Sequence, residues 1–172
     1  MKSFFKILFF LFIIKNTVAQ DLTNIVYLEL NDGRVVIEMK PDDAPKHVER
    51  IKELISEKFY DGLKFHRVID GFMAQTGDPK GNGTGGSGQN IPAEFNSLPH
   101  IRGTVSMARA QDPDSADSQF FICFKPAPFL DRQYTVFGKV IEGMEFVDLV
   151  KRGEGSNGAV SNPDKIITLT TK

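Results

Sequence analysis

The sequence has 172 residues, 41% of them apolar and 25% charged, which is typical of one globular domain with a real hydrophobic core. Lys and Arg number 21 against 22 Asp and Glu, so charge gives no argument for binding nucleic acid. The single cysteine, Cys123, excludes an intrachain disulfide and is expected to be a small buried hydrophobe. The three histidines lie far apart, without the helical spacing of metal ligands, so no metal site is expected.

Residues 1–19 have the layout of a secretory signal peptide. Lys2 and Lys6 precede an apolar run at 7–14, and residues 17–19 offer the small side chains of a cleavage site. The run is short for a membrane span, which takes roughly 20 residues. A retained anchor is therefore the less favoured alternative to cleavage.

Cleavage after Ala19 would remove Lys2, Lys6 and Lys15, which takes the formal net charge from −1 to −4. The protein would then be periplasmic or secreted, with no membrane anchor. No repeat or internal linker interrupts the rest, so we expect a single domain over residues 20–172.

The first expected elements are a β-hairpin and an amphipathic helix. Residues 25–40 alternate apolar and polar side chains on both sides of Asp32-Gly33, a strong hairpin signal. A helix is then expected to end near Gly62, with Asp42 or Asp43 as its N-terminal cap. Apolar side chains recur at three- and four-residue spacing at Ala44, Val48, Ile51, Leu54 and Ile55.

The later apolar runs are short and separated by Gly, Pro, Asn and Asp, which indicates strands. They cover residues 65–69, 72–75, 104–110, 119–124, 134–140 and 166–170. A second helix is expected over 143–153, with Gly153 as its left-handed stop. About eight strands with two helices, without regular alternation, favour an antiparallel barrel whose open ends the helices could cap.

The glycine-rich segment 81–88 contains G-x-G-x-x-G, the pattern of dinucleotide-binding loops. Those loops follow a strand and open a helix, whereas this segment leads into Asn90-Ile91-Pro92. Neither a phosphate-binding G-K-[ST] nor a G-x-S-x-G nucleophile elbow occurs in the chain. A flexible surface loop is the better interpretation, and no cofactor is expected.

Arg67 is a permanent cation within an apolar strand. It is therefore either part of an ordinary surface ion pair or a charge held beside an apolar floor for a functional role. The neighbouring His66 is expected to be a core or interstrand hydrogen-bonding residue. A three-residue loop at 70–72 would oppose Arg67 to Gln75, but a two-residue loop would oppose it to Ala74, and the sequence permits both. The candidate groove residues are Arg67, Phe72, Met73, Gln75, Gln119, Phe121, Phe129, Leu130 and Tyr134.

In these residues the chain resembles the cyclophilins, a family of peptidyl-prolyl cis-trans isomerases. The resemblance covers nearly the whole chain after residue 19 and includes several long motifs in the family's order. It implies a closed eight-stranded antiparallel barrel with a helix at each end, and it favours the three-residue loop. The motifs are FHRVIDGFMAQTGD, GTGG, AEFN, RGTVSMARA, SQFFICF and FLDRQYTVFGKVIEGME.

The resemblance also implies roles for individual residues. Arg67 corresponds to the catalytic arginine and Gln75 to the residue that orients it. Ala108 and Gln119 match positions that border the substrate backbone, and the donors and backbone at Arg109 would help to hold the flanking chain. The expected pocket for the proline ring comprises Phe72, Met73, Phe121 and Leu130, with Phe129 and Tyr134 as walls.

Four positions depart from the best-known eukaryotic pattern and resemble bacterial members. Phe129 stands where tryptophan is usual, Tyr134 where histidine is usual, Arg109 where asparagine is usual and Asp70 where proline is frequent. Catalysis should survive these changes. The missing indole removes a hydrogen-bond donor, so weak or no binding of the cyclic peptide cyclosporin is expected.

The implied reaction suits these residues because rotation about an X-Pro bond breaks no covalent bond and needs neither nucleophile nor metal. A donor aimed at the proline nitrogen favours the twisted state, in which the nitrogen regains its lone pair. The expected partners are proline-containing segments of exported proteins, and a monomer is expected. The alternative is a holdase or interaction module that binds proline peptides without turnover.

Overall fold

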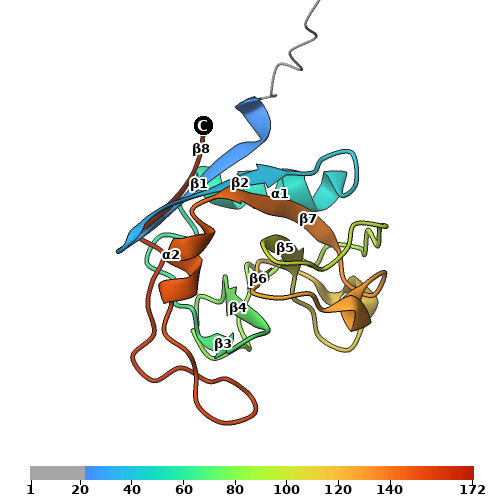
Figure 1. Ribbon diagram of the computed structural model, residues 1–172. Coiled ribbons are helices and arrows are strands. Elements are labelled where there is room, and N and C mark those ends of the chain that lie inside the picture. Colours follow the sequence, from blue (N-terminus) through green and yellow to red (C-terminus); the bar gives the residue numbers. More distant parts are fainter. Residues whose placement is uncertain (1–21) are drawn as a thin grey trace, which may run out of the picture.

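The computed structural model describes residues 22–172, which form an eight-stranded, curled antiparallel sheet with two α-helices (Figure 1). The strands follow the order β3-β4-β6-β5-β7-β2-β1-β8 across the sheet. The expected signal peptide at 1–19 lies outside the described residues. The strands are β1 (Ile25–Leu30), β2 (Gly33–Met39), β3 (Arg67–Ile69), β4 (Met73–Thr76), β5 (Thr104–Met107), β6 (Phe120–Cys123), β7 (Val136–Glu142) and β8 (Thr168–Thr171).

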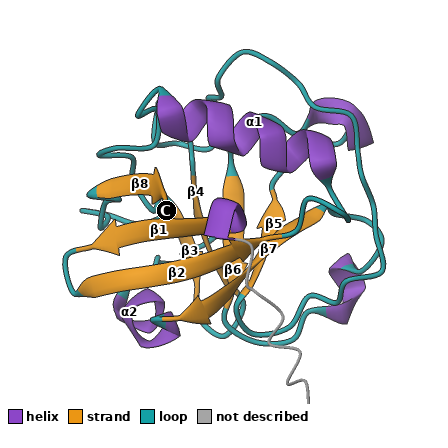
Figure 2. Cartoon of the chain, turned by 90° about the horizontal axis from the view of Figure 1, so that it is seen from above, coloured by secondary structure: helices purple, strands orange, loops and turns teal. Residues whose placement is uncertain are grey.

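The two helices lie on opposite sides of the strands, as the view from above shows (Figure 2). They are α1 (Pro45–Ser56), which contacts β8, and α2 (Met144–Leu149), which contacts β2. Single 3₁₀ turns cover Leu22–Asn24, Pro113–Ser115 and Pro128–Leu130. Within residues 22–172, no helix is both long and apolar enough to cross a membrane.

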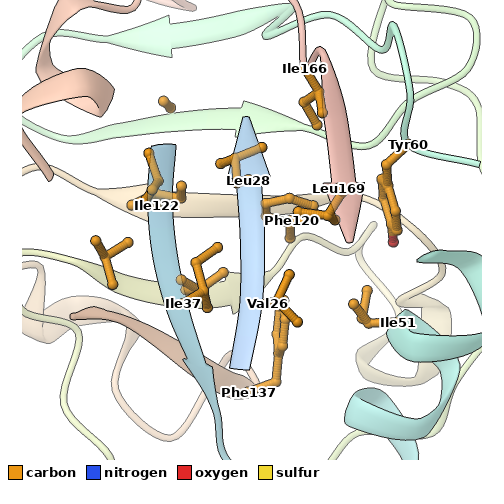
Figure 3. Close-up of a cluster of buried hydrophobic side chains, with 14 of the residues drawn as sticks. Val26, Leu28, Ile37, Ile51, Tyr60, Phe120, Ile122, Phe137, Ile166 and Leu169 are labelled. Carbon is orange, nitrogen blue, oxygen red and sulfur yellow. The ribbon is translucent and has the colours of Figure 1, made fainter. Parts of the chain in front are cut away.

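The core fills the inside of the curled sheet (Figure 3). Val26 and Leu28 of β1 pack with Phe120 and Ile122 of β6, and Ile51 brings α1 onto the same cluster. The expected hairpin is confirmed, because β1 and β2 pair in the antiparallel register that the alternating pattern predicts. Alternation along the strands is thus what sends every second side chain into this core.

The start of α1 corrects the expected cap, because neither Asp42 nor Asp43 caps the helix and the N-cap residue Ala44 makes no side-chain bond. Instead, the Glu94 carboxylate accepts hydrogen bonds from the backbone N–H groups of Lys46 and His47, both at 3.1 Å. Its Oε2 also lies 2.7 Å from Nδ1 of His47. Burial would raise the pKa of Glu94, but these contacts together hold that pKa below its usual value. The cap comes from a loop 47 residues away.

The end of α1 also differs from the expectation of a stop near Gly62. The helix ends at Ser56, and Lys58 adopts the left-handed conformation with φ of 58°. The N–H of Phe59 donates to the Leu54 carbonyl and that of Lys58 to Ile55, which is the hydrogen-bond pattern of a Schellman motif. A lysine therefore performs the role expected of a glycine.

Helix α2 is shorter than the expected 143–153 span, and Gly153 is not its stop. The helix ends at Leu149 and leaves through Val150 in a non-helical conformation, while Gly143 precedes it with φ of 80°. Gly153 serves a different purpose, because a Cβ there would lie 1.9 Å from the Gly158 carbonyl oxygen. Its N–H donates to the Val68 carbonyl, so the position demands close backbone approach rather than a helix cap.

The expected closed barrel is corrected to a curled, incompletely closed sheet, since the end strands β3 and β8 do not form a ladder with each other. Only the segments before them are joined, through an isolated bridge between Lys64 and Lys165. The reason lies at the outer edge of β3, where Val68 bonds instead with Gly153 and Gly158 of the α2–β8 loop. A loop thus occupies the edge that a closing strand would need.

Candidate active site

The β3–β4 hairpin uses the three-residue loop. Arg67 pairs with Gln75 and Ile69 with Met73, which confirms the register that the family resemblance favoured. Directly opposed residues project from the same face of a sheet. The turn thus places the guanidinium, the amide and the Met73 thioether on one outer surface.

The Arg67 guanidinium is held by two neutral acceptors. Its Nη1 donates to Oε1 of Gln75 at 3.1 Å, and its Nε donates to the backbone carbonyl of Asn157 at 3.0 Å. No carboxylate of the described residues forms an ion pair with it, and Nη2 has no hydrogen-bond partner there. Burial lowers the pKa of Arg67, with Tyr134 opposing the shift, but a guanidinium stays charged at neutral pH. The alternative of a surface ion pair is therefore not what this side chain adopts.

Behind Arg67, two glutamines connect the guanidinium to the glycine-rich loop. Gln75 uses its Nε2 to donate to Oε1 of Gln119 at 2.9 Å. Gln119 in turn donates to the carbonyl oxygens of Gly83 at 3.2 Å and Gly85 at 2.7 Å. These bonds leave the Gln75 amide one orientation, with its oxygen toward Arg67.

The apolar floor is a second hydrophobic cluster, separate from the barrel core. Along β6, Phe120 and Ile122 enter the core, while Phe121 and Cys123 face the other way and join this cluster. The cluster consists of buried Met73, Phe121, Cys123, Ala127 and Leu130, with Ile69, Phe72, Ala108 and Tyr134 partly buried around them. The strand alternation thus builds the core and the floor from one sequence run.

Aromatic side chains form the walls. Phe129 is 64% exposed, and its ring centroid lies 5.5 Å from that of Phe72. Tyr134 meets Phe121 edge-to-face at 6.1 Å, and the Arg109 guanidinium lies 4.6 Å from the Tyr134 ring centroid. Arg109 also donates to the backbone carbonyls of Ala110, Gln111 and Gln133, so it ties the two sides of this wall together.

These groups border a cleft of about 520 Å³, within the range of small-ligand and peptide sites. Ten of the eleven residues expected in the site line it. The exception is Gln119, which lines an adjoining cleft of about 370 Å³ that shares Gln75, Ala108 and Arg109 with the first. The residues that the sequence did not predict are His66, Asn82, Gly83, Asn157 and Ala159.

Two carboxylates organise the glycine-rich loop, and neither was predicted from the sequence. Buried Asp78 accepts hydrogen bonds from the backbone N–H groups of Lys80, Asn82 and Gly83, while Asp117 accepts those of Ser87 and Gly88. Burial would raise the pKa of Asp78, but these donors together hold it below its usual value. An acid three residues before the first glycine of a glycine-rich run was the available signal for Asp78.

Two other groups that resemble nucleophilic machinery are buried. Burial raises the pKa of the Cys123 thiol to about 12, which leaves it protonated and inert. His100 lies 2.9 Å from Asp131 and 3.0 Å from the Ser106 hydroxyl, the order of a hydrolase triad. Ser106 and His100 are 0% and 1% exposed and border neither cleft, so no substrate can reach this serine.

His66 is buried, which confirms the core position, the first of the two expected alternatives, and neither ring nitrogen has a hydrogen-bond partner among the described residues. Burial lowers its pKa, so the neutral ring is favoured. Within residues 22–172, no group of three or more His, Cys, Asp and Glu side chains is arranged to hold a metal ion.

The family model described as "Cyclophilin type peptidyl-prolyl cis-trans isomerase/CLD" matches residues 25–171, which is nearly the whole described chain. The protein belongs to the cyclophilin family. Curated relatives from Brucella suis and Bacillus subtilis are named peptidyl-prolyl cis-trans isomerases, and this chain is a cyclophilin-type peptidyl-prolyl cis-trans isomerase.

Among these relatives, a "Probable peptidyl-prolyl cis-trans isomerase" of Brucella suis is 57% identical, covering 88% of this chain and 84% of the relative. "Peptidyl-prolyl cis-trans isomerase B" of Bacillus subtilis is 46% identical, covering 74% of this chain and 91% of the relative. A solved cyclophilin of Cryptosporidium parvum, crystallised with the dipeptide Ala-Pro, superposes with a TM-score of 0.80 at 30% identity, covering 86% and 98%.

Proposed function

We propose that this cyclophilin accelerates rotation about X-Pro bonds by donating a hydrogen bond from Arg67 to the proline nitrogen. The observation that carries the proposal is the guanidinium itself: Nε and Nη1 have neutral acceptors, and Nη2 has none in the described part of the chain. The apolar floor of Met73, Phe121 and Leu130 borders the same cleft and suits a proline ring. A donor and a ring pocket side by side are what stabilise a twisted imide.

The energetics explain why the floor matters as much as the donor. The barrier to amide rotation is about 18–20 kcal/mol. A rate gain of about 10⁵ requires lowering the activation free energy by about 7 kcal/mol, because each tenfold gain in rate corresponds to about 1.36 kcal/mol. One preorganised donor supplies about 3–4 kcal/mol. The balance comes from holding the ring and the flanking chain in one geometry.

The substrates are proline-containing peptide segments. The Cryptosporidium parvum neighbour crystallised in the presence of Ala-Pro supports this assignment, because its fold superposes over 86% of this chain. The cleft accommodates a proline and its neighbours, and it continues into the adjoining cleft across Ala108 and Arg109. Such a site contacts backbone and ring and accepts many flanking sequences.

The test is Arg67→Ala, followed by exchange spectroscopy on a proline peptide, which reports turnover as well as binding. The variant should fold normally, because both Arg67 bonds lie near the surface, and turnover should fall by about two to three orders of magnitude. Binding should persist through the apolar floor. Unchanged turnover in the folded variant would contradict the assignment of Arg67.

We further propose that the protein acts outside the cytoplasm, in the periplasm or after secretion, and assists the folding of exported proteins. The basic-apolar-small pattern of residues 1–19 supports this proposal. Mass spectrometry of the protein from fractionated cells should find Gln20 as the first residue, in the exported fraction. An uncleaved chain confined to the cytosol would overturn the proposal.

A further inference from the structure

The α2–β8 loop holds the outer edge of the strand that carries Arg67 (Figure 1). The N–H of Val68 donates to the Gly158 carbonyl at 2.8 Å, and the N–H of Gly153 donates to the Val68 carbonyl at 2.8 Å. A third bond, from Val160 to the His66 carbonyl, measures 3.1 Å. These bonds fall on the two residues that flank Arg67. We call residues 153–160 the β3-edge loop.

The same loop contacts the guanidinium directly. The Asn157 carbonyl accepts from Nε at 3.0 Å, while Gln75 accepts from Nη1 at 3.1 Å from the β4 side. A planar group held by a single hydrogen bond can still rotate about that bond, whereas two acceptors from different segments define its plane. Both acceptors are uncharged, so they orient the cation without neutralising it.

The approach of the Asn157 carbonyl depends on Gly158. This residue has φ of +71°, and a Cβ on it would lie 2.5 Å from Cγ1 of Ile69 and 2.9 Å from the Val68 carbonyl oxygen. A side chain there forces the loop away from β3. Gly155 in the same loop has a similar φ of +65°, but its Cβ would meet only Oδ1 of Asn157, at 3.9 Å.

We propose that the Asn157-Gly158 segment of the β3-edge loop is a positioning device for the isomerase reaction: Gly158 seats the Asn157 carbonyl against Nε of Arg67 and thereby aims Nη2 at the proline nitrogen. The inference rests on the proposed role of Arg67 and adds to it. The loop meets the apolar cluster at Ile69 of β3, and none of its backbone hydrogen bonds within the described residues goes to Met73, Phe121 or Leu130, so we expect its main effect on turnover rather than on affinity.

The test compares Gly158→Ala with Gly155→Ala, which imposes similar left-handed strain without the collision with β3. Line-shape analysis of a proline peptide by NMR separates turnover from binding. Gly158→Ala should lower turnover about 10-fold, in line with a small displacement of a catalytic group, and leave the dissociation constant within about 2-fold. Gly155→Ala should match the unmodified protein in both. Equal turnover in the two variants would overturn the inference.

A spectroscopic signature reports the bond itself. The Nε–H resonance of Arg67, assigned by its loss in Arg67→Lys, should move toward that of a solvent-exposed arginine in Gly158→Ala and stay in place in Gly155→Ala. If Gly158→Ala does not fold, Asn157→Gly provides the milder change, because it removes the Oδ1 that accepts from the Ala159 N–H and loosens the same carbonyl. Its Nε–H resonance should move the same way, and turnover should fall. An unmoved resonance with full turnover would contradict the inference.

A double-variant comparison separates this inference from the proposed function. Lysine keeps a charge at position 67 but lacks the planar Nε donor, so adding Gly158→Ala to Arg67→Lys should cause no further loss of turnover. A further 10-fold loss would show that the loop acts elsewhere and overturn the inference. Full activity of Arg67→Lys and Arg67→Ala would instead contradict the role of Arg67 itself.

Discussion

Arg67 is a cation that the protein surrounds with neutral acceptors. A carboxylate partner would attract the guanidinium strongly and compete with any substrate for its N–H groups. The amide of Gln75 and the carbonyl of Asn157 orient it at lower electrostatic cost. The orienting amide is itself fixed by Gln119, so a chain of side-chain amides sets the direction of one donor.

At the same scale, Phe129 predicts the response to cyclosporin. Its ring is 64% exposed at the mouth of the cleft and packs on Phe72, but phenylalanine has no N–H to offer a cyclic peptide. Binding by the unmodified protein should therefore be weak or undetectable in titration calorimetry. Phe129→Trp restores a donor at that position and should tighten binding by about 10-fold, the worth of one hydrogen bond. Nanomolar binding by the unmodified protein would contradict this interpretation.

At the scale of elements, α1 depends on a residue outside itself. Glu94 accepts hydrogen bonds from two backbone N–H groups of the first turn and from the buried His47 ring. It therefore caps the N-terminus of α1, and its negative charge interacts favourably with the helix dipole there. The AEFN motif that contains it thereby joins the helix to the wall of the site, since the Glu94 N–H donates to the Thr135 hydroxyl next to Tyr134.

Glu94→Ala should lower the free energy of unfolding by about 2 kcal/mol, because it removes the cap and leaves Nδ1 of His47 buried without an acceptor. Denaturant titration followed by circular dichroism measures the change. The matched control is Asp42→Ala, which removes an exposed acid that makes no capping bond, and which should change stability by less than about 0.5 kcal/mol. A larger loss in the control than in Glu94→Ala would show that the local acid caps the helix after all.

At the scale of the whole molecule, all three histidines are buried, and burial lowers the pKa of each. A carboxylate opposes the shift at each of them, Glu94 at His47, Asp78 at His66 and Asp131 at His100, without reversing it. The unfolded chain therefore binds more protons than the native protein once the pH falls below the unfolded pKa of about 6.5. Stability from these groups is fully present above that pH and is lost as the pH decreases.

We therefore expect the free energy of unfolding to decrease between pH 7.5 and pH 5.5, with each histidine contributing at most about 1.4 kcal/mol per pH unit. Carboxylates with lowered pKa, such as Asp78 and Glu94, lose their contribution only further into the acid range, below about pH 4. Denaturant unfolding across the upper window isolates the histidines. Constant stability from pH 7.5 to 5.5 would contradict the predicted burial of neutral rings.

Local sequence patterns were enough to predict the strands, the hairpin at residues 25–40 and the alternation of β6, because side-chain period is a local property of the backbone. Of the eleven site residues that the sequence motifs marked, ten line the cleft. Predictions from local sequence were wrong where contacts join distant segments. Glu94 caps α1 in place of the expected aspartate, and Gly153 allows the backbone to approach Gly158 closely instead of ending a helix.

The use of the β3 edge, in contrast, follows from contacts that form only in the folded chain. The sequence of residues 153–160 has no periodicity that predicts their pairing with β3. That pairing prevents closure of the barrel and places the Asn157 carbonyl against Nε of Arg67. Every residue has the same backbone carbonyl acceptor, so the identity of the side chain at position 157 cannot predict that this carbonyl binds Arg67. The fold, and not the residue type, supplies that contact.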